Sequence, residues 1–279
     1  MITAASLATM TDFAQSGLNA SAWTRANRTR FQQDVVAPMQ AVMAAVERTW
    51  GEDFQADLAR IQTPSGVRLH RDRIYLGSCS RTPAWLHAAT AAWVPHDFIN
   101  EPKVAPRIEL RLAYGFWEMG FAFTKDGHSG MCQMVANLLP NQHALERMLD
   151  PLLGGNWFQW CVRERVRTLA AEGHGIVNTY ESYEARDFFD GITAWDRIIS
   201  ATTATAWDTL PDQNLDKFAI YIVSMVRRVY PLIMLATAAD PDMAVRGIEN
   251  YLILLAKEHP EMRPKFRASN IIPFPVAKS

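Results

Sequence analysis

Apolar and charged residues alternate over residues 107–112 with the two-residue period of a β-strand. The apolar set is Ile108, Leu110 and Leu112, and the charged set is Arg107, Glu109 and Arg111. Successive side chains of a strand point to opposite faces of a sheet, so this segment predicts a strand with one apolar and one charged face. A Tyr114-Gly115 turn and an apolar run over residues 116–123 follow it. We therefore expect an antiparallel hairpin whose charged face meets water.

The clearest amphipathic helix is predicted over residues 22–50, where apolar residues recur at helical spacing. Asn19 or Ser21 is the expected N-cap. Pro38 is expected to kink or break this helix, because proline lacks an N–H and its ring clashes with the preceding turn. Further helices are predicted over residues 141–149, 157–171, 194–210, 216–238 and 241–257, a strand over residues 176–183, and a loop over residues 125–130.

Short β-like runs over residues 66–70 and 74–76 precede the hairpin, so the sheet is expected to begin near residue 66. Together the segments predict an α+β fold, in which an antiparallel sheet in the first half packs against the kinked N-terminal helix and several C-terminal helices. Residues 1–258 are expected to form a single domain. Residues 259–279, which are rich in proline, are expected to form an extended and partly mobile tail.

The charge balance excludes a protein that is basic as a whole. Lys plus Arg number 28 and Asp plus Glu 29, so the net charge of −1 exerts no general attraction on nucleic acid or an acidic membrane. Any anion site must therefore be local. Cys79, Cys132 and Cys161 have no C-x-x-C partner, which argues against a disulfide framework or a zinc ribbon and favours a cytoplasmic protein.

The sequence predicts neither membrane insertion nor a bound cofactor. The N-terminus lacks the basic region and the sustained apolar stretch of a secretory signal. The richest apolar run, over residues 218–239, contains Arg227, Arg228 and Pro231, so it predicts a core helix and no membrane span. The seven histidines show neither H-x-x-x-H nor H-E-x-x-H spacing, so no metal site is expected.

The strongest local charge feature is a segment over residues 68–81, called here the basic segment. Its candidate site residues are Arg68, His70, Arg71, Asp72, Arg73 and Arg81. Guanidinium groups offer forked donors that match phosphate oxygens. The segment therefore favours non-catalytic binding of an anionic partner, either a phosphorylated small molecule or a nucleic acid. The alternative is an edge strand kept soluble by charge, with Asp72 in an ordinary ion pair.

Two other functions stay open at this stage. One is a cofactor-independent enzyme in which Arg71 and Asp72 line a pocket together with His70 or His128. Gly127-His128-Ser129-Gly130 is not a serine-nucleophile elbow, since Met131 stands where the last glycine of G-x-S-x-G belongs. The other is a structural or protein-interaction module, which would show a large exposed apolar patch or a stable dimer.

Several motifs resemble those of a large family of conserved bacterial proteins of unknown function. The opening helix resembles the family's N-x-x-x-W and V-x-x-P pattern at Asn19, Trp23, Val35 and Pro38. The run from Arg68 to Arg73 looks like its basic strand, Arg81-Thr82-Pro83 is similar to its K-T-P, and Pro231-Leu232 to its closing P-L pair. Departures are Ile74 in place of the usual Phe and Trp85 in place of a usual Lys. The resemblance spans about residues 13–240 and implies an architecture, but no activity.

Overall fold

The computed structural model describes residues 1–60, 69–71, 74–77, 88–98, 100–101, 104–113, 117–123, 128–153, 159–165, 176–182, 189, 198–207 and 214–258, in places by the backbone alone. The helices in this part of the chain are α1 (Ala4–Gln15), α2 (Ala20–Ala26), α3 (Arg28–Phe31), α4 (Ala37–Arg60), α5 (His128–Leu138), α6 (Gln142–Leu153), α8 (Leu215–Thr237) and α9 (Pro241–Glu258). The strands are β1 (Leu69–Arg71), β2 (Tyr75–Gly77), β3 (Ala88–Pro95), β4 (Arg107–Leu112), β5 (Trp117–Ala122), β6 (Gln159–Arg165), β7 (Ile176–Ser182) and β8 (Ile198–Trp207).

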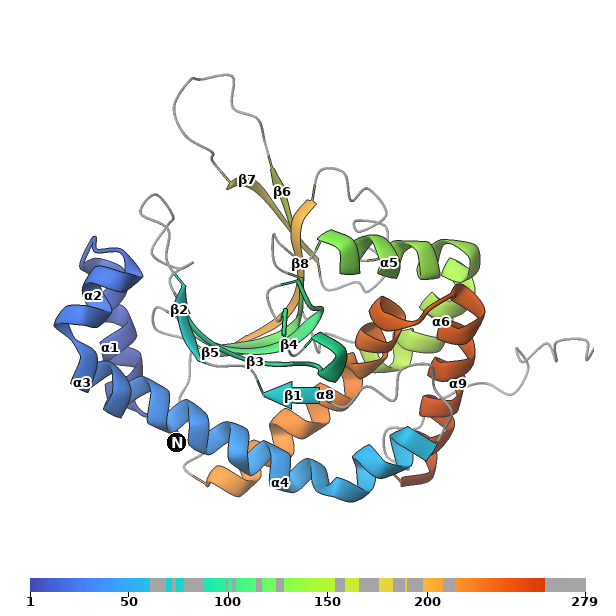
Figure 1. The fold of residues 1–279 in the computed structure, drawn as a ribbon, viewed down its shortest axis with the longest axis horizontal. Coiled ribbons are helices and arrows are strands. Elements are labelled where there is room, and N and C mark those ends of the chain that lie inside the picture. The colour runs from blue at the N-terminus through green and yellow to red at the C-terminus, as the bar shows by residue number, and fades with distance from the viewer. Residues whose placement is uncertain are drawn as a thin grey trace, which may run out of the picture.

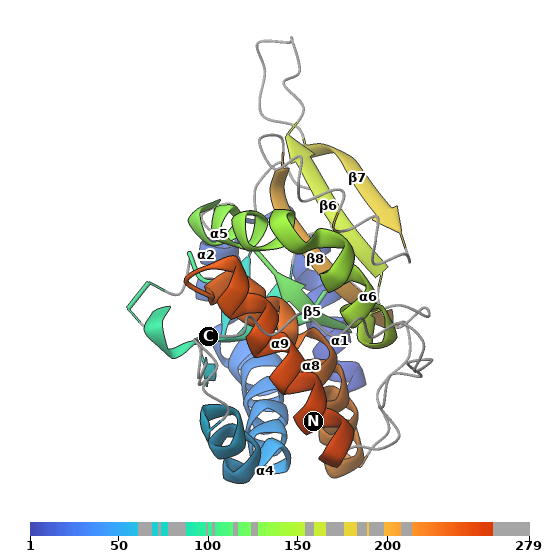
Figure 2. The ribbon, with the colours of Figure 1, turned by 90° about the vertical axis from the view of Figure 1, so that its right-hand side faces the viewer.

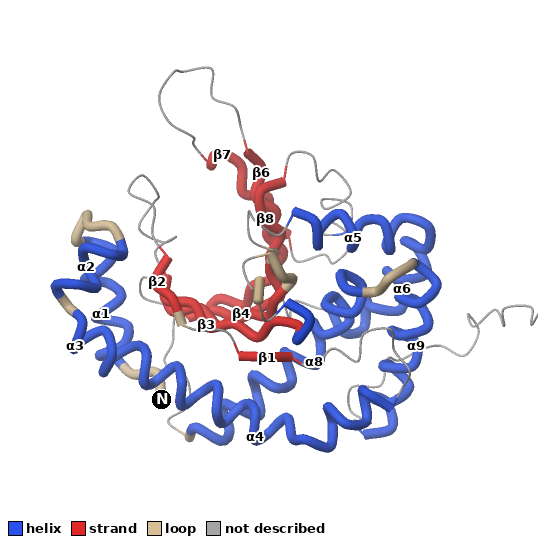
Figure 3. Tube along the Cα trace, viewed as in Figure 1, coloured by secondary structure: helices blue, strands red, loops and turns tan. Residues whose placement is uncertain are grey.

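The α+β class predicted from the sequence is confirmed. The described strands form one sheet in the order β1-β3-β4-β5-β8-β6-β7, with β2 also paired to β3, and every pair is antiparallel. Figure 3 shows this sheet as one strongly curved layer, with α4 and α8 on its outer side. The sheet starts in the first half, as expected, and continues through β8, β6 and β7 of the second half.

Two predicted helices are wrong, because the segments 157–171 and 194–210 contain strands. The first contains β6 and the second β8, which pair with each other. Ile and Thr dominate β8, and these β-branched residues favour strands. The predicted strand over 176–183 is confirmed as β7.

The sequence analysis also missed β3 and the whole of α5. All eight residues of β3 are buried, and its backbone pairs with β4 on one side and with β1 and β2 on the other. A strand buried on both faces shows no alternation, and its alanines are helix formers in isolation. The loop expected over residues 125–130 is wrong at its end, since α5 already begins at His128.

Helix α8 is the centre of the hydrophobic core. It packs against α4, α5, α6, α9 and β5, and Trp117 of β5 meets Phe218 of α8 edge to face at 4.7 Å between ring centroids. Figures 1 and 2 show α4, α8 and α9 gathered on the outer side of the curved sheet. By length and composition α8 could cross a membrane, but 72% of its apolar stretch is buried inside the protein. This burial supports the expected core helix.

Contrary to the expectation from the sequence, the helix does not bend sharply at Pro38. A π-helical turn lies just before Pro38, and the sharp bend of α4 lies further along the chain. Residues Gln32–Val36 form a π-helical turn, in which the Ala37 N–H donates to the carbonyl of Gln32, five residues back. Such a turn shifts the hydrogen-bond pattern just before a residue that has no N–H to contribute. The bend inside α4 falls at Gly51, whose φ of 77° suits glycine and is strained for other residues.

Side chains from other helices satisfy the backbone carbonyls that α8 leaves open. Pro231 cannot donate to the carbonyl of Arg227, four residues earlier, and the Tyr251 hydroxyl donates to it at 2.6 Å instead. At the C-terminal end, Asn137 of α5 donates to the carbonyls of Leu235 and Ala238 at 2.8 and 2.9 Å. Helix ends need such partners when they are buried.

Candidate functional site

The structure describes only part of the basic segment. His70 and Arg71 lie in β1, and of these two residues only the backbone is described. Arg68, Asp72, Arg73 and Arg81 lie outside the described residues. Among the described strands β1 is an end strand of the sheet and pairs with β3 alone, with Arg71 opposite Trp93 and His70 opposite Val94. Both the anion-site prediction and its edge-strand alternative agree with an end position of β1, so this position does not distinguish them. His128, the other histidine of the enzyme hypothesis, begins α5.

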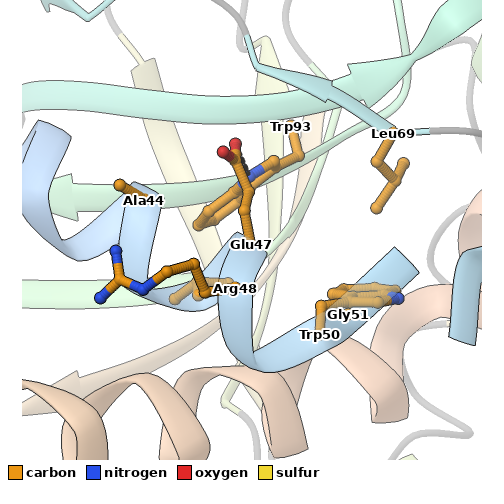
Figure 4. A pocket seen from close by; sticks show the side chains of 8 residues that line it. Ala44, Glu47, Arg48, Trp50, Gly51, Leu69 and Trp93 are labelled. Atoms are coloured by element: carbon orange, nitrogen blue, oxygen red, sulfur yellow. Dashed lines mark hydrogen bonds between the residues drawn. The ribbon is translucent and has the colours of Figure 1, made fainter. Parts of the chain in front are cut away.

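A pocket of about 640 Å³ lies between α4 and the sheet edge formed by β1 and β3. Its lining includes Glu47, Arg48, Trp50 and Gly51 of α4, Leu69 of β1 and Trp93 of β3. This volume falls within the roughly 300–1,000 Å³ typical of small-molecule sites. Figure 4 shows Leu69 above Trp50 at one end, Ala44 at the other, and Glu47 with Trp93 between them.

The pocket forms where α4 bends. Gly51 changes the direction of the chain directly after Trp50, so the helix and the sheet edge do not pack flush there. Trp93 has Ile108 as its cross-strand neighbour and belongs to the core on the helix-covered face of the sheet. Both tryptophans are held firmly, with only 7% of Trp50 and 4% of Trp93 exposed.

Among the described residues that line the pocket, the charged ones are two neighbours on α4, Glu47 and Arg48. The indole N–H of Trp93 donates to Oε1 of the half-buried Glu47 at 3.4 Å. Arg48 is exposed, and Figure 4 shows its guanidinium pointing away from the Glu47 carboxylate. The site therefore combines aromatic and aliphatic walls, one carboxylate inside and one guanidinium at the rim.

The charged face of β4 and β5 is buried, so the predicted water-exposed face is wrong. Arg107 pairs with Glu109 at 3.7 Å, and Arg111 pairs with Glu118 of the neighbouring strand. The exposed side-chain fractions are 2%, 12%, 15% and 12% in the order Arg107, Glu109, Arg111 and Glu118. The apolar face, which includes Trp117, meets α8, so these charged side chains lie on the opposite face of the sheet.

Within the part of the chain that the structure describes, the ionisable groups with clearly shifted pKa values are Tyr221 and Arg228 of α8, and neither lines the pocket. Burial raises the pKa of Tyr221 to about 12, and the charge of Arg228 opposes this shift. Burial likewise lowers the pKa of Arg228, whose guanidinium donates to the Leu152 carbonyl at the end of α6. Among the described residues no group of three or more His, Cys, Asp or Glu side chains forms a metal site.

Sequence reasoning named the basic segment but missed Glu47, Trp50 and Trp93. Glu47 and Trp93 are 46 residues apart, and neither belongs to a chemical motif. The only local signal was Trp50-Gly51, where glycine allows a bend.

The fold and the pocket define an α+β protein with an aromatic-walled site at the edge of an antiparallel sheet. No protein-family model matches the chain, and no curated protein matches it at a significant level. The resemblance to the bacterial family of unknown function therefore stays a prediction, as does the single domain over residues 1–258. The predicted tail lies outside the described residues.

Proposed function

We propose that this protein binds an anionic small molecule, without catalysis, in the pocket between α4 and the sheet edge. The supporting observation is the register of β1 against β3. It sets Arg71 opposite Trp93, and Leu69, the first residue of β1, lines the pocket. The described part of the basic segment thus borders a concave site.

The pocket favours a small phosphorylated ligand over a nucleic acid. Its volume of about 640 Å³ suits a metabolite, and the net charge of −1 provides no wide basic surface for a polymer. Guanidinium groups bind phosphate in a bidentate way, and their attraction strengthens where water is partly excluded. A cytoplasmic location remains part of the proposal, and the free thiol of Cys132 agrees with a reducing compartment.

Salt elution of the full-length chain from phosphocellulose tests this proposal. The variant is Arg71→Ala, and its matched control is Arg25→Ala, which removes the same charge from an exposed position on α2. Loss of a charge-assisted contact is expected to weaken binding to the phosphate groups of the matrix at least about tenfold. Arg71→Ala should therefore elute at lower salt than Arg25→Ala.

Equal elution of the two variants contradicts the proposal and favours the edge-strand alternative, in which each arginine contributes only net charge. Thermal unfolding of both variants checks that they are folded. Arg73→Ala gives a second measurement within the basic segment if Arg71→Ala is destabilised.

A further inference from the structure

The two ends of the described sheet differ in how they are protected against pairing with a strand of another chain. At one end lie β1 and β2, which have three residues each, and the basic segment runs through both. Short length and charge are features that keep an edge strand from pairing with another chain. At the other end lies β7, which has seven residues and pairs with β6 alone among the described strands. Figure 2 shows β7 as the outermost strand there.

The sequence of β7 lacks these protective features. It reads Ile-Val-Asn-Thr-Tyr-Glu-Ser, in which β-branched and aromatic residues favour a strand, and it contains neither proline nor lysine. Its one charged residue is Glu181. In an antiparallel pair, every second residue turns its N–H and C=O away from the neighbouring strand, so an edge strand of this length fits a strand from a partner.

The partner that suits β7 is a second copy of the same strand. Two β7 strands that pair antiparallel about Thr179 place Val177 opposite Glu181, and the remaining pairs contain no charged residue. Like charges directly opposite each other would oppose pairing, and this register has none. The pairing is twofold and joins the free edge of one β7 to that of the other, so it closes the assembly at two chains.

We infer that two copies of this chain associate through β7 into a twofold dimer, in which the two sheets continue as one. The dimer is independent of the ligand proposed for the pocket, which lies beside β1 at the opposite end of the sheet. The interface consists of one pair of seven-residue strands and is therefore small. Small interfaces bind weakly, so the dimer is expected to form in a concentration-dependent way.

Light scattering on the full-length chain, over a series of protein concentrations, measures the dimer. The test variant is Thr179→Glu, which brings two carboxylates together at the twofold axis. Within one chain this substitution is favourable, because Thr179 lies opposite Arg163 of β6. The matched control is Thr179→Gln, which has a similar shape and no charge. Thr179→Glu is expected to raise the dissociation constant of the dimer at least about tenfold above that of Thr179→Gln.

A mixture of Thr179→Glu and Thr179→Lys should restore the dimer, because opposite charges then meet at the axis. This rescue needs two folded chains, so it excludes loss of folding as the cause of the weaker association.

Cysteine cross-linking tests the register. Directly opposite residues of an antiparallel pair have Cα atoms about 4.5–5.5 Å apart, which suits a disulfide. Thr179→Cys is therefore expected to form a covalent dimer under oxidising conditions, above the level of the unmodified chain. The control Asn178→Cys lies opposite Tyr180 of the other copy and should stay at that level.

Three results would overturn the inference. One is a chain that stays monomeric at every concentration. Another is a dimer that Thr179→Glu and Thr179→Gln affect equally, because its interface then lies elsewhere. The third is equal cross-linking of Thr179→Cys and Asn178→Cys, which contradicts pairing about Thr179.

Discussion

The helices around α8 and the inner face of the sheet both bury polar groups, but they satisfy them in different ways. Around α8, neutral side chains such as Asn137 and Tyr251 donate to backbone carbonyls. On the inner face of β4 and β5, charged side chains pair with each other, as Arg111 does with Glu118. Loss of a neutral donor leaves a carbonyl without its hydrogen bond. Loss of one charged side chain leaves the other charge buried and unpaired, which costs more. Removal of one polar side chain should therefore reduce the free energy of unfolding more on the inner face of the sheet than around α8.

The largest effect is expected for Glu118→Ala on the inner face. This substitution leaves the Arg111 charge buried without its partner. Because the two side chains are 12–15% exposed, we expect the free energy of unfolding to fall by about 2–3 kcal/mol. Urea unfolding measures it. The double variant Arg111→Met with Glu118→Leu should recover most of this loss, since it removes both charges. A loss below about 0.5 kcal/mol for Glu118→Ala would mean that solvent still screens the pair.

Asn137→Ala should cost about 2 kcal/mol, because it removes the donor to two carbonyls at the end of α8. The comparison variant is Gln133→Ala, which removes a half-buried donor to the Ala238 carbonyl and to Oδ1 of Asn137, leaves the Leu235 carbonyl paired, and should cost less. The comparison uses urea unfolding of the two variants. Equal losses would show that the bond from Asn137 to Leu235 contributes nothing.

High pH should weaken the α8 region through Tyr221. Its folded pKa of about 12 lies above the unfolded value of 10.0, so between these values the unfolded chain has lost a proton that the folded chain retains. Stability is therefore complete below pH 10 and falls as the pH rises toward 12, by about 1 kcal/mol for a half-exposed group. Urea unfolding at pH 9 and 11 should show this fall, and Tyr221→Phe should reduce it. An identical fall in both proteins would assign the effect to other groups.

The smallest effect is expected for Tyr251→Phe, which deletes only the hydroxyl that serves the Arg227 carbonyl. A single neutral hydrogen bond contributes about 1 kcal/mol. In a Pro231→Ala background the new N–H can serve the same carbonyl, so Tyr251→Phe should cost less there. Equal costs in the two backgrounds would show that the hydroxyl does not replace the missing helix donor. Urea unfolding of the four proteins completes this cycle.

The parts of the fold that could be predicted are those whose pattern is local. The Asn19 cap, the α8 helix and the β4–β5 hairpin follow from residues close together in the sequence. β3 could not be recognised, because burial on both faces removes its alternation. The water-exposed face assigned to Arg107 and Glu109 was wrong, since alternation along a strand shows which side chains share a face but not whether that face is covered.

The candidate site divides in the same way. The charge of the basic segment is visible in the sequence, since it needs only neighbouring residues. The pocket is not visible, because it requires Gly51 to bend α4 beside a strand that comes about forty residues later in the chain. The charge of the segment could therefore be predicted without its place in the fold, and the structure places the backbone of His70 and Arg71 in β1.

Native mass spectrometry of the full-length chain, purified at low salt, tests the central claim most directly. The account predicts that part of the protein carries an added mass of a phosphorylated small molecule, and that Arg71→Ala loses this mass while Arg25→Ala keeps it. The same added mass at the same level in all three proteins, or the bare chain alone in all of them, would contradict anion binding at this sheet edge.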